Sequence, residues 1–436
     1  MISLSLFVPI LNKHIFADAS KFMTPNTNPK KKKHPRSLFY RISAWLHLWL
    51  GLVTGIVMVI VCVTGCLYVF IDEIQSVLNP ETNIARQDKP VLTPSQISNA
   101  AAKIYPDEKV SYATYRQGKA ITVGLGEGRK GNVTLYIHPY TGALLKKELK
   151  EKGQTDFFSF VLSGHRFLWM PYKIGRPIVN YSTLIFVVIL ISGVVLWWPK
   201  KWTKSTRERS FQIKWGASFK RVNYDFHNVL GFYSLLVLLA IALTGMVYGI
   251  EWYSKGLYWV TSAGQSLPDY NDAKSDSLQA NKFYTSAAAM DLAWNKVITK
   301  TPEARGFYFG YPDTTDAKST INIYIYPTVG KYYDYMSFSF DRHTLKEFPA
   351  HPVYDVKFSE ASLPTKIRKM NYDIHVGSIL GLPGKILAFF AALIGASLPI
   401  TGFIIWWGKR KKKPKKSGAA AKPVAKKRAV VEESIT

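Results

Sequence analysis

Four long apolar stretches constrain this chain more than any other feature of its sequence. They cover residues 44–70, 178–198, 226–250 and 386–407. Each reaches the roughly 20 residues that an α-helix needs to cross a bilayer core of about 30 Å. Because backbone amides find no water in lipid, such stretches cross a membrane as helices. The sequence therefore predicts a membrane protein, mainly α-helical, with four transmembrane helices.

Basic residues flank these stretches and indicate an orientation. Residues 30–41, 199–221 and 409–428 contain 6, 8 and 11 Lys and Arg residues but a single acidic residue, Glu208. These segments account for most of the net charge of +28. Lys and Arg concentrate on the cytoplasmic side of membrane proteins. We therefore expect both termini in the cytoplasm, with the basic tail on anionic lipid headgroups and no nucleic acid as partner.

This orientation assigns the remaining segments to the two faces. The predicted cytoplasmic parts are a tail at 1–43, a loop at 199–225 and a tail at 408–436. The two long polar segments, residues 71–177 and 251–385, are then predicted on the outer, periplasmic face. Each of them is expected to hold one folded module and a segment that approaches the membrane. The expected location is the cytoplasmic (inner) membrane.

Cysteine and glycine patterns limit the chemistry. Cys62 and Cys66 lie one helical turn apart in the first apolar stretch, so they are expected to pack there and to form no outer-face disulfide. No C-x-x-C-H motif occurs, so covalent haem attachment is not expected. GLGEG at residues 124–128 has the glycines of a dinucleotide loop without a following helix, so no nucleotide site is expected there.

The two halves of the chain repeat one spacing, which indicates an internal duplication. His47 precedes Gly51 in LHLWLG by four residues, and His227 precedes Gly231 in FHNVLG by the same four. A second glycine follows each of these histidines after 18 residues, at Gly65 and Gly245. Further along each half, His165 and His375 precede a Trp-Trp pair by 32 and 31 residues. Each half is thus predicted to run as span, outer module, span.

The outer modules share an order of elements. Residues 91–145 begin with the helix candidate TPSQISNAAAKIYP, capped by Thr93, and continue with the strand candidates KAITVGLG and NVTLYIHP. Residues 281–348 repeat this order with TSAAAMDLAWNKVITK, TINIYIYP and MSFSFDRHTLKEF. The sequence predicts two small α+β modules on the outer face.

The orientation also gives each histidine a depth. His47 and His227 begin spans that run outward, which places this first pair near the cytoplasmic face. His165 and His375 precede spans that run inward, which places this second pair near the outer face. Two histidines at one depth on different helices can bind one metal from opposite sides. An ionisable residue within a span is a functional candidate.

Haem fits this layout because a porphyrin is a flat plate that needs small residues beside it. Residues four apart share a helix face, so Gly51 and Gly231 are expected to leave room beside the first pair. Eighteen residues of helix span about 27 Å, which brings Gly65 and Gly245 to the second pair. In the inward spans, the glycines expected beside the first pair are Gly193 and Gly402. We expect two b-type haems, one between the histidines of each pair.

Other interpretations of the histidines stay open. A histidine at a membrane boundary, and glycine next to Ser or Thr, are common where helices pack closely. Zinc or copper also binds imidazole, but the sequence places no carboxylate or thiolate to complete four ligands. A single haem shared among three or four of the histidines is a further possibility.

The chain resembles the PepSY-associated transmembrane proteins, which include the ferrioxamine-type siderophore reductases. The resemblance covers most of residues 41–411 and is carried by LHLWLG, FHNVLG, the GHRFL and GRP elements and the two modules. HVGSILGLPGK departs from it, because it lacks the Arg of GRP. The resemblance implies an iron-related oxidoreductase that reduces a ferric siderophore from Fe(III) to Fe(II).

Two functions follow from these observations. A haem with two histidine ligands has no open position, so it relays electrons. The electron donor is expected to be a cytoplasmic reductase or a membrane quinol, and the acceptor a ferric siderophore at the outer face. The alternative is a membrane-anchored protein whose PepSY-like modules bind peptides or regulate peptidases, without redox activity.

Overall fold

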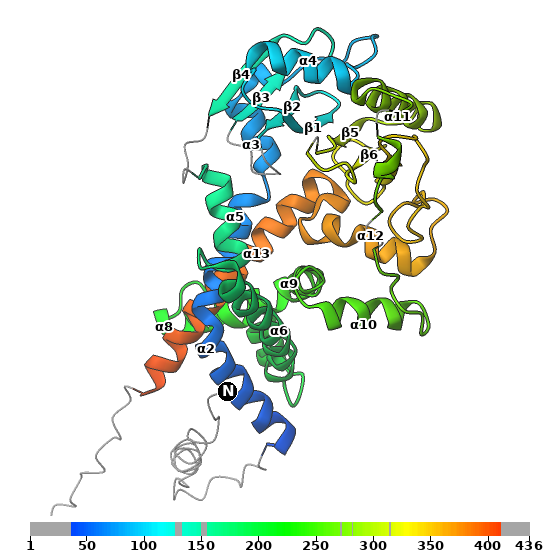
Figure 1. Ribbon diagram of the computed structural model, residues 1–436. Helices are drawn as coiled ribbons and strands as arrows, with labels where there is room; N and C mark the ends of the chain where they lie inside the picture. Colours follow the sequence, from blue (N-terminus) through cyan, green and yellow to red (C-terminus); the bar gives the residue numbers. More distant parts are fainter. Residues whose placement is uncertain are drawn as a thin grey trace, which may run out of the picture. The chain divides into compact units, whose positions relative to one another are not determined.

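The computed structural model describes residues 36–126, 133–149, 155–270, 273–280, 282–313 and 315–410 (Figure 1). Most of the predicted N-terminal tail, the tail beyond residue 410 and the end of GLGEG lie outside these residues. Four helices of the described part are long and apolar enough to cross a membrane, which confirms that prediction. They are α2 (Leu38–Tyr68), α6 (Tyr172–Trp197), the composite helix Phe219–Met246 and α13 (Leu382–Arg410).

The ends of these helices differ from the apolar stretches. Helix α2 begins six residues before the stretch at 44–70, because helical backbone hydrogen bonds do not require apolar side chains. The third helix ends at Met246 rather than at residue 250. Just beyond its end, Nδ2 of Asn180 on α6 donates to the carbonyl oxygen of Gly249 over 2.8 Å. A Cβ at residue 249 would lie 2.1 Å from Oδ1 of Asn180, so this close approach requires glycine.

The third helix contains a π-helical turn at a histidine. It consists of α8 (Phe219–Asp225), the π turn η4 (Phe226–Leu230) and α9 (Gly231–Met246). His227 lies in the π turn. Such turns add one residue to a helix and are frequent at functional sites.

Two shorter helices carry the other histidines. Helix α5 (Phe157–Phe167) precedes α6, and the carboxylate of Asp156 caps its first turn by accepting from the backbone N–H of Ser159. Helix α12 (Leu363–His375) precedes α13 and ends at His375 itself. The remaining short helices are α3 (Ile71–Leu78), η2 (Pro80–Thr82), α7 (Lys204–Phe211), α10 (Glu251–Thr261), η5 (Ser277–Gln279) and η6 (Ser378–Leu380).

The two predicted modules share one antiparallel sheet, in the order β4-β3-β2-β1-β5-β6-β7. Strands β1 and β5 join the halves, from the pair Tyr112↔Gly310 to the pair Arg116↔Gly306. Small sheets are marginally stable and their open edges attract other strands, so edge-to-edge pairing stabilises both. The first half contributes β1 (Val110–Arg116), β2 (Ile121–Leu125), β3 (Val133–Ile137) and β4 (Leu144–Leu149). The second half contributes β5 (Gly306–Gly310), β6 (Thr320–Tyr326) and β7 (Met336–Asp341).

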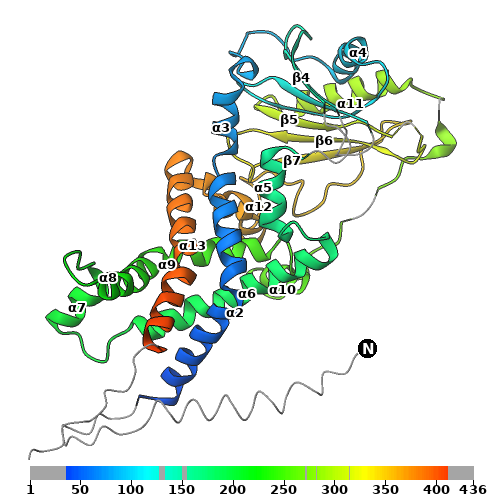
Figure 2. The same cartoon turned by 90° about the vertical axis from the view of Figure 1, so that its left-hand side faces the viewer.

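One face of the sheet is covered by two helices, α4 (Pro94–Ile104) and α11 (Ser286–Lys300) (Figure 2). Thr93 caps α4 in a capping box with Gln96, as its position in the sequence predicted. Alternate strand residues pack against Ile97 and Trp294 to form the core. This core is continuous across both halves, so the sheet folds as one layer.

A loop of the sheet contacts the helix that carries His375. The backbone N–H of Tyr332, between β6 and β7, lies 3.1 Å from a carboxylate oxygen of Asp373 on α12. Lys369 of α12 donates from Nζ to the carbonyl oxygen of Tyr335 over 2.6 Å. Lys331 donates in the same way to the carbonyl oxygen of Ile379, over 2.9 Å. The β6–β7 loop therefore lies directly on α12.

Trp197 packs inside the protein rather than at its surface. Its ring stacks on Phe232 with centroids 3.8 Å apart, and Nε1 donates to the carbonyl oxygen of Ser210 over 3.1 Å. The neighbouring Trp198 is exposed. Consecutive residues point about 100° apart on a helix, and here Trp197 faces the protein whereas Trp198 does not.

Candidate functional site

The structure brings the four histidines together in two pairs. The ring centroids of His47 and His227 are 6.0 Å apart, with planes at 90°. Those of His165 and His375 are 6.2 Å apart, with planes at 63°. These are the pairs that helix orientation indicated, and each takes one histidine from each half of the chain. Their role as ligands stays a prediction.

Each imidazole lies in a small cradle on a facing helix. Nδ1 of His47 lies 3.0 Å from the carbonyl oxygen of Ile189 and 3.1 Å from Oγ of Ser192, both on α6. Gly193 follows, and a Cβ there would lie 3.2 Å from Cε1 of His47. The cradle thus consists of a glycine, the hydroxyl one residue before it and the carbonyl four residues before it.

The other three histidines have cradles of the same composition. Each Nδ1 lies 2.9 to 3.1 Å from the carbonyl oxygen and 3.0 to 3.3 Å from the hydroxyl. The cradles are Leu398, Thr401 and Gly402 on α13 for His227; Val61, Thr64 and Gly65 on α2 for His165; and Ile241, Thr244 and Gly245 on α9 for His375.

The cradles determine which ring nitrogen is available. A carbonyl oxygen can only accept a hydrogen bond, so Nδ1 of each ring carries the hydrogen and donates it. Nε2 is then the unprotonated nitrogen, with its lone pair free to bind a metal. In the described part of the chain, no hydrogen bond involves Nε2 of these four histidines. Metal-binding histidines usually donate from the second nitrogen in this way, which fixes the ring and raises its basicity.

The glycines of the cradles make room for the imidazoles. A Cβ at Gly65 or Gly245 would lie 3.3 or 3.0 Å from Cε1 of the histidine that it faces, which is tighter than an ordinary contact. From the sequence, both glycines were predicted to lie beside the second pair. The space that they leave was assigned to a porphyrin. The structure fills that space with the histidine itself, because the ring must approach the helix backbone to reach the carbonyl.

The other two glycines of the repeated spacing have different surroundings. A Cβ at Gly51 would meet no described atom within 4 Å, so the helix face one turn beyond His47 is open. A Cβ at Gly231 would lie 3.4 Å from Cδ2 of Leu398, an ordinary contact. Leu398 also supplies the carbonyl oxygen of the His227 cradle.

The centroid separation in each pair would allow both histidines to hold one haem iron between them. A metal bound by two opposed imidazoles at about 2 Å separates the ring centroids by about 6 Å, once the ring radii are added. The observed separations are 6.0 and 6.2 Å. Among the described residues, no group of three or more His, Cys, Asp and Glu could hold a metal ion. A bare zinc or copper ion would lack ligands here, whereas a porphyrin supplies four nitrogens itself.

A repeated pentapeptide supports one histidine of each pair, and sequence analysis missed it. Asn-Tyr-Asp-x-His occurs at residues 223–227 and again at 371–375. Nδ2 of Asn223 donates to the carbonyl oxygen of Thr401 over 3.1 Å, and Nδ2 of Asn371 donates to that of Thr244 over 3.0 Å. Each asparagine therefore ties its helix to the cradle of its own histidine. The repeat of Asn-Tyr-Asp before both histidines was the sequence signal that could have revealed this motif.

The aspartates of the pentapeptide are buried and hydrogen-bonded. Asp225 accepts from Nε of Arg221 over 2.8 Å, while its other oxygen, Oδ1, has no partner among the described residues. Asp373 accepts from the backbone N–H of Tyr332 and from the hydroxyl of Ser378. Burial raises the pKa of Asp373, and the hydrogen bond from Ser378 opposes this shift. The Asp225 contact lies within α8, whereas Asp373 joins α12 to the β6–β7 loop.

The remaining described histidines have local roles. Nδ1 of His138 accepts from the backbone N–H of Tyr140, and Nδ1 of His351 accepts from that of Val353. Nε2 of His343 lies 2.8 Å from the carbonyl oxygen of Ala317. The contacts of His138 and His351 lie within local turns, whereas that of His343 joins two separate loops. His14 and His34 lie outside the described residues.

Comparison with known proteins agrees with the arrangement of the spans. A family model described as the PepSY-associated TM region matches residues 44–409, which include all four histidines. No curated protein matches the chain.

Proposed function

The chain belongs to the PepSY-associated transmembrane family, and from this premise we propose that it is a di-haem b electron-transfer protein that reduces a ferric chelate. The proposed acceptor is a ferric siderophore at the outer face of the cytoplasmic membrane. The observation that carries the proposal is the common cradle of the four histidines. Helix packing alone does not require a hydrogen bond from Nδ1 to a backbone carbonyl oxygen, yet all four histidines make one.

The histidines act as fixed ligands in this proposal. Each cradle holds its imidazole in one orientation and directs the Nε2 lone pair away from the supporting helix. Two histidines would leave a haem iron held between them no open position for oxygen or substrate. Haem bound in this way supplies reversible one-electron transfer. The protein contributes the orientation, the ligand basicity and an apolar surrounding that excludes water.

The separation of the two pairs supports transfer across the membrane. His47 and Gly65 lie 18 residues apart on α2, which corresponds to about 27 Å of helix. Gly65 contacts His165, so the two pairs lie near opposite ends of an apolar helix. This distance is close to the thickness of a bilayer core. Electrons would enter at the first pair and leave from the second pair.

The proposed reaction needs one electron for each iron. Fe(III) in the chelate gains that electron and leaves as Fe(II), which hard oxygen ligands bind less tightly. The donor is a cytoplasmic reductase or a membrane quinol, because no dinucleotide-binding loop followed by a helix occurs in the sequence. On this proposal the protein is a ferric-chelate reductase.

The direct test is a spectrum of the protein purified in mild detergent. Sharp reduced α-bands of b type, with about two haems per chain by the pyridine haemochrome assay, are expected after dithionite. His138→Ala provides a matched control, because His138 makes only a turn contact. A haem-free preparation from haem-replete cells would contradict the proposal and favour the peptide-binding alternative.

A further inference from the structure

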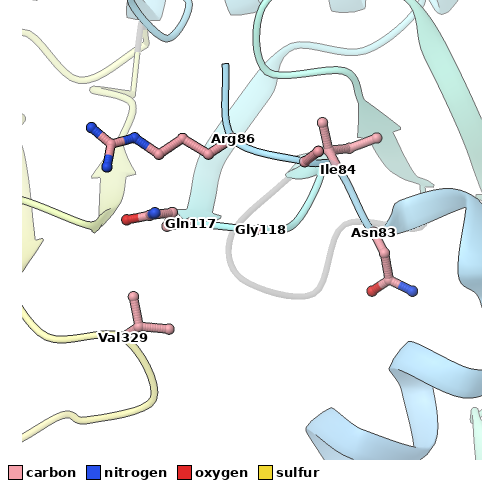
Figure 3. Close-up of a pocket in the computed structure, with 7 residues that line it drawn as sticks. Asn83, Ile84, Arg86, Gln117, Gly118 and Val329 are labelled. Atoms are coloured by element: carbon pink, nitrogen blue, oxygen red, sulfur yellow. The ribbon is translucent and has the colours of Figure 1, made fainter. Parts of the chain in front are cut away.

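A pocket opens beside the sheet, between three segments that are distant in sequence. Its cavity of about 410 Å³ is lined by residues that follow η2, by the β1–β2 turn and by the β6–β7 loop. Figure 3 shows Arg86 and Gln117 next to each other, with Val329 facing them from its own loop. An adjoining cavity of about 400 Å³ shares Arg86 and Gln117 and extends to Tyr115, Tyr140 and Arg305. Each volume lies in the usual range of small-molecule sites.

The cations around this pocket have neutral partners. Nζ of Lys119 donates to Oγ of Ser76 over 2.7 Å and to Oδ1 of Asn83 over 2.6 Å. The guanidinium of Arg116 lies 3.3 Å from the ring centroid of Tyr326. Lys331 donates to backbone carbonyls and also lies near the carboxylate of Asp373. The partners of Lys119 and Arg116 named here carry no charge.

The lining itself is also positively charged. Arg86, Lys89 and Arg305 line the two cavities, and Asp88 is the only acidic residue among the lining residues. In the described part of the chain, neither arginine forms a salt bridge. The hydroxyls of Tyr115 and Tyr140 lie 3.5 Å apart and add hydrogen-bond donors. Guanidinium, hydroxyl and amide groups together suit the oxygens of an anionic ligand.

A single loop links the lining of the pocket to the helix that carries His375. Val329 lines the pocket, and Tyr332 lies three residues further along the same loop. The ring of Tyr332 lies 4.9 Å from that of Tyr372 on α12, centroid to centroid. Tyr372 is one helical turn before His375. The loop that lines the pocket therefore also contacts α12 next to the second pair.

We propose that this pocket binds the electron acceptor as an anionic ferric chelate, with Arg86 as its principal contact. This inference rests on the proposed function and specifies the charge of its substrate. Arg86 is exposed and borders both cavities, so it can reach a ligand in either. Carboxylate, catecholate or hydroxamate oxygens of a chelate gain charge-assisted hydrogen bonds here. A cationic chelate would meet repulsion from the same groups.

Binding can be measured without any redox reaction by using gallium in place of iron. The probe is the anionic complex Ga(III)–EDTA, which is not reduced, titrated calorimetrically into the full-length protein in detergent. Arg86→Ala is expected to weaken the binding about ten- to hundredfold, since it removes a charge-assisted contact. Added salt should weaken the binding as well. The cationic gallium complex of desferrioxamine B should bind more weakly than the EDTA complex.

The control variant removes one positive charge from another surface. Lys103 is exposed in the last turn of α4, on the helix-covered side of the sheet, so Lys103→Ala should leave the affinity unchanged. Equal affinity for both gallium complexes, or equal losses in Arg86→Ala and Lys103→Ala, would overturn the proposed pocket. The haem content of the same preparation is measured separately by the pyridine haemochrome assay. Haem without chelate binding overturns only the pocket, whereas chelate binding without haem overturns only the electron-transfer function.

Discussion

Gly245 and His375 are in direct contact, because a Cβ at residue 245 would lie 3.0 Å from Cε1 of the imidazole. The contact brings the ring close enough for its Nδ1 to reach the carbonyl oxygen of Ile241 over 2.9 Å. The glycine and the hydrogen bond therefore depend on each other. The same relationship recurs at the other three histidines.

This contact predicts an unusual effect of Gly245→Ala. Alanine normally stabilises a helix by about 1 kcal/mol relative to glycine. Here the added methyl group would push the imidazole away, and we expect a loss of about 1–3 kcal/mol and a changed spectrum of one haem. Gly256→Ala on α10 is the control, since a Cβ there would meet no described atom within 4 Å. Thermal unfolding and the reduced spectrum measure both effects, and equal behaviour of the two variants would contradict the role of the contact.

The pairing of the histidines predicts which variants share a phenotype. His47→Ala and His227→Ala should each remove the same spectral component, because their rings face each other at 6.0 Å. His165→Ala and His375→Ala should remove the other component. The haem content of each variant should fall from about two to about one per chain. If His47→Ala and His165→Ala removed the same component, the pairs would be assigned wrongly.

The hydroxyls of the cradles are predicted to tune the two sites separately. Oγ1 of Thr244 lies 3.2 Å from Nδ1 of His375 and accepts its hydrogen together with the carbonyl. Thr244→Val keeps the shape but removes this acceptor, so the ligand becomes less basic. The reduction potential of the second site should rise by on the order of tens of millivolts, with the first site unchanged. Thr244→Ser should restore the potential in a redox titration, and a shift in both sites would point to a general structural change.

The sheet is predicted to lose stability in acid through Asp341. Burial alone would raise the pKa of Asp341, but the backbone N–H groups of Asp276, Thr344 and His343 bind the carboxylate and lower it overall. A depressed folded-state pKa stabilises the protein above the unfolded pKa of about 4 and loses its effect as pH falls through the folded value.

Asp341→Asn should therefore be less stable than the natural protein at neutral pH. The difference should shrink below about pH 4, where the carboxylate becomes protonated. Hydrogen exchange of the backbone amides of β7, which contains Asp341, reports unfolding of this region. A difference that stays constant between pH 7 and pH 3 would show that the carboxylate charge plays no part.

The spans and the histidine pairs follow from the sequence because both depend on local periodicity. Apolar length predicts a crossing helix, and the direction of each helix gives its first residue a depth. His47 and His227 could thus be matched before their distance was known. The cradles could not be predicted in the same way, because a backbone carbonyl such as that of Ile189 leaves no mark in the amino-acid sequence.

The joining of the two sheets also escaped sequence analysis. Strand patterns show which residues alternate, but the pairing of β1 with β5 is set by contacts almost 200 residues apart. The glycines of the cradles could be predicted in part. Gly65 and Gly245 were placed correctly, yet their physical purpose became clear only with the imidazoles against them. The spacing therefore identified the histidine pairs and the glycines beside them, but the contact that requires glycine became visible only in the folded structure.

The interleaving of the halves has a consequence for synthesis on the ribosome. The first pair needs His227 from the second half, and the cradle of His227 lies at residues 398–402. The second pair needs His375. The first pair is therefore complete only after residue 402 has left the ribosome, and the second only after residue 375 has. A chain that stops before residue 375 would hold neither pair.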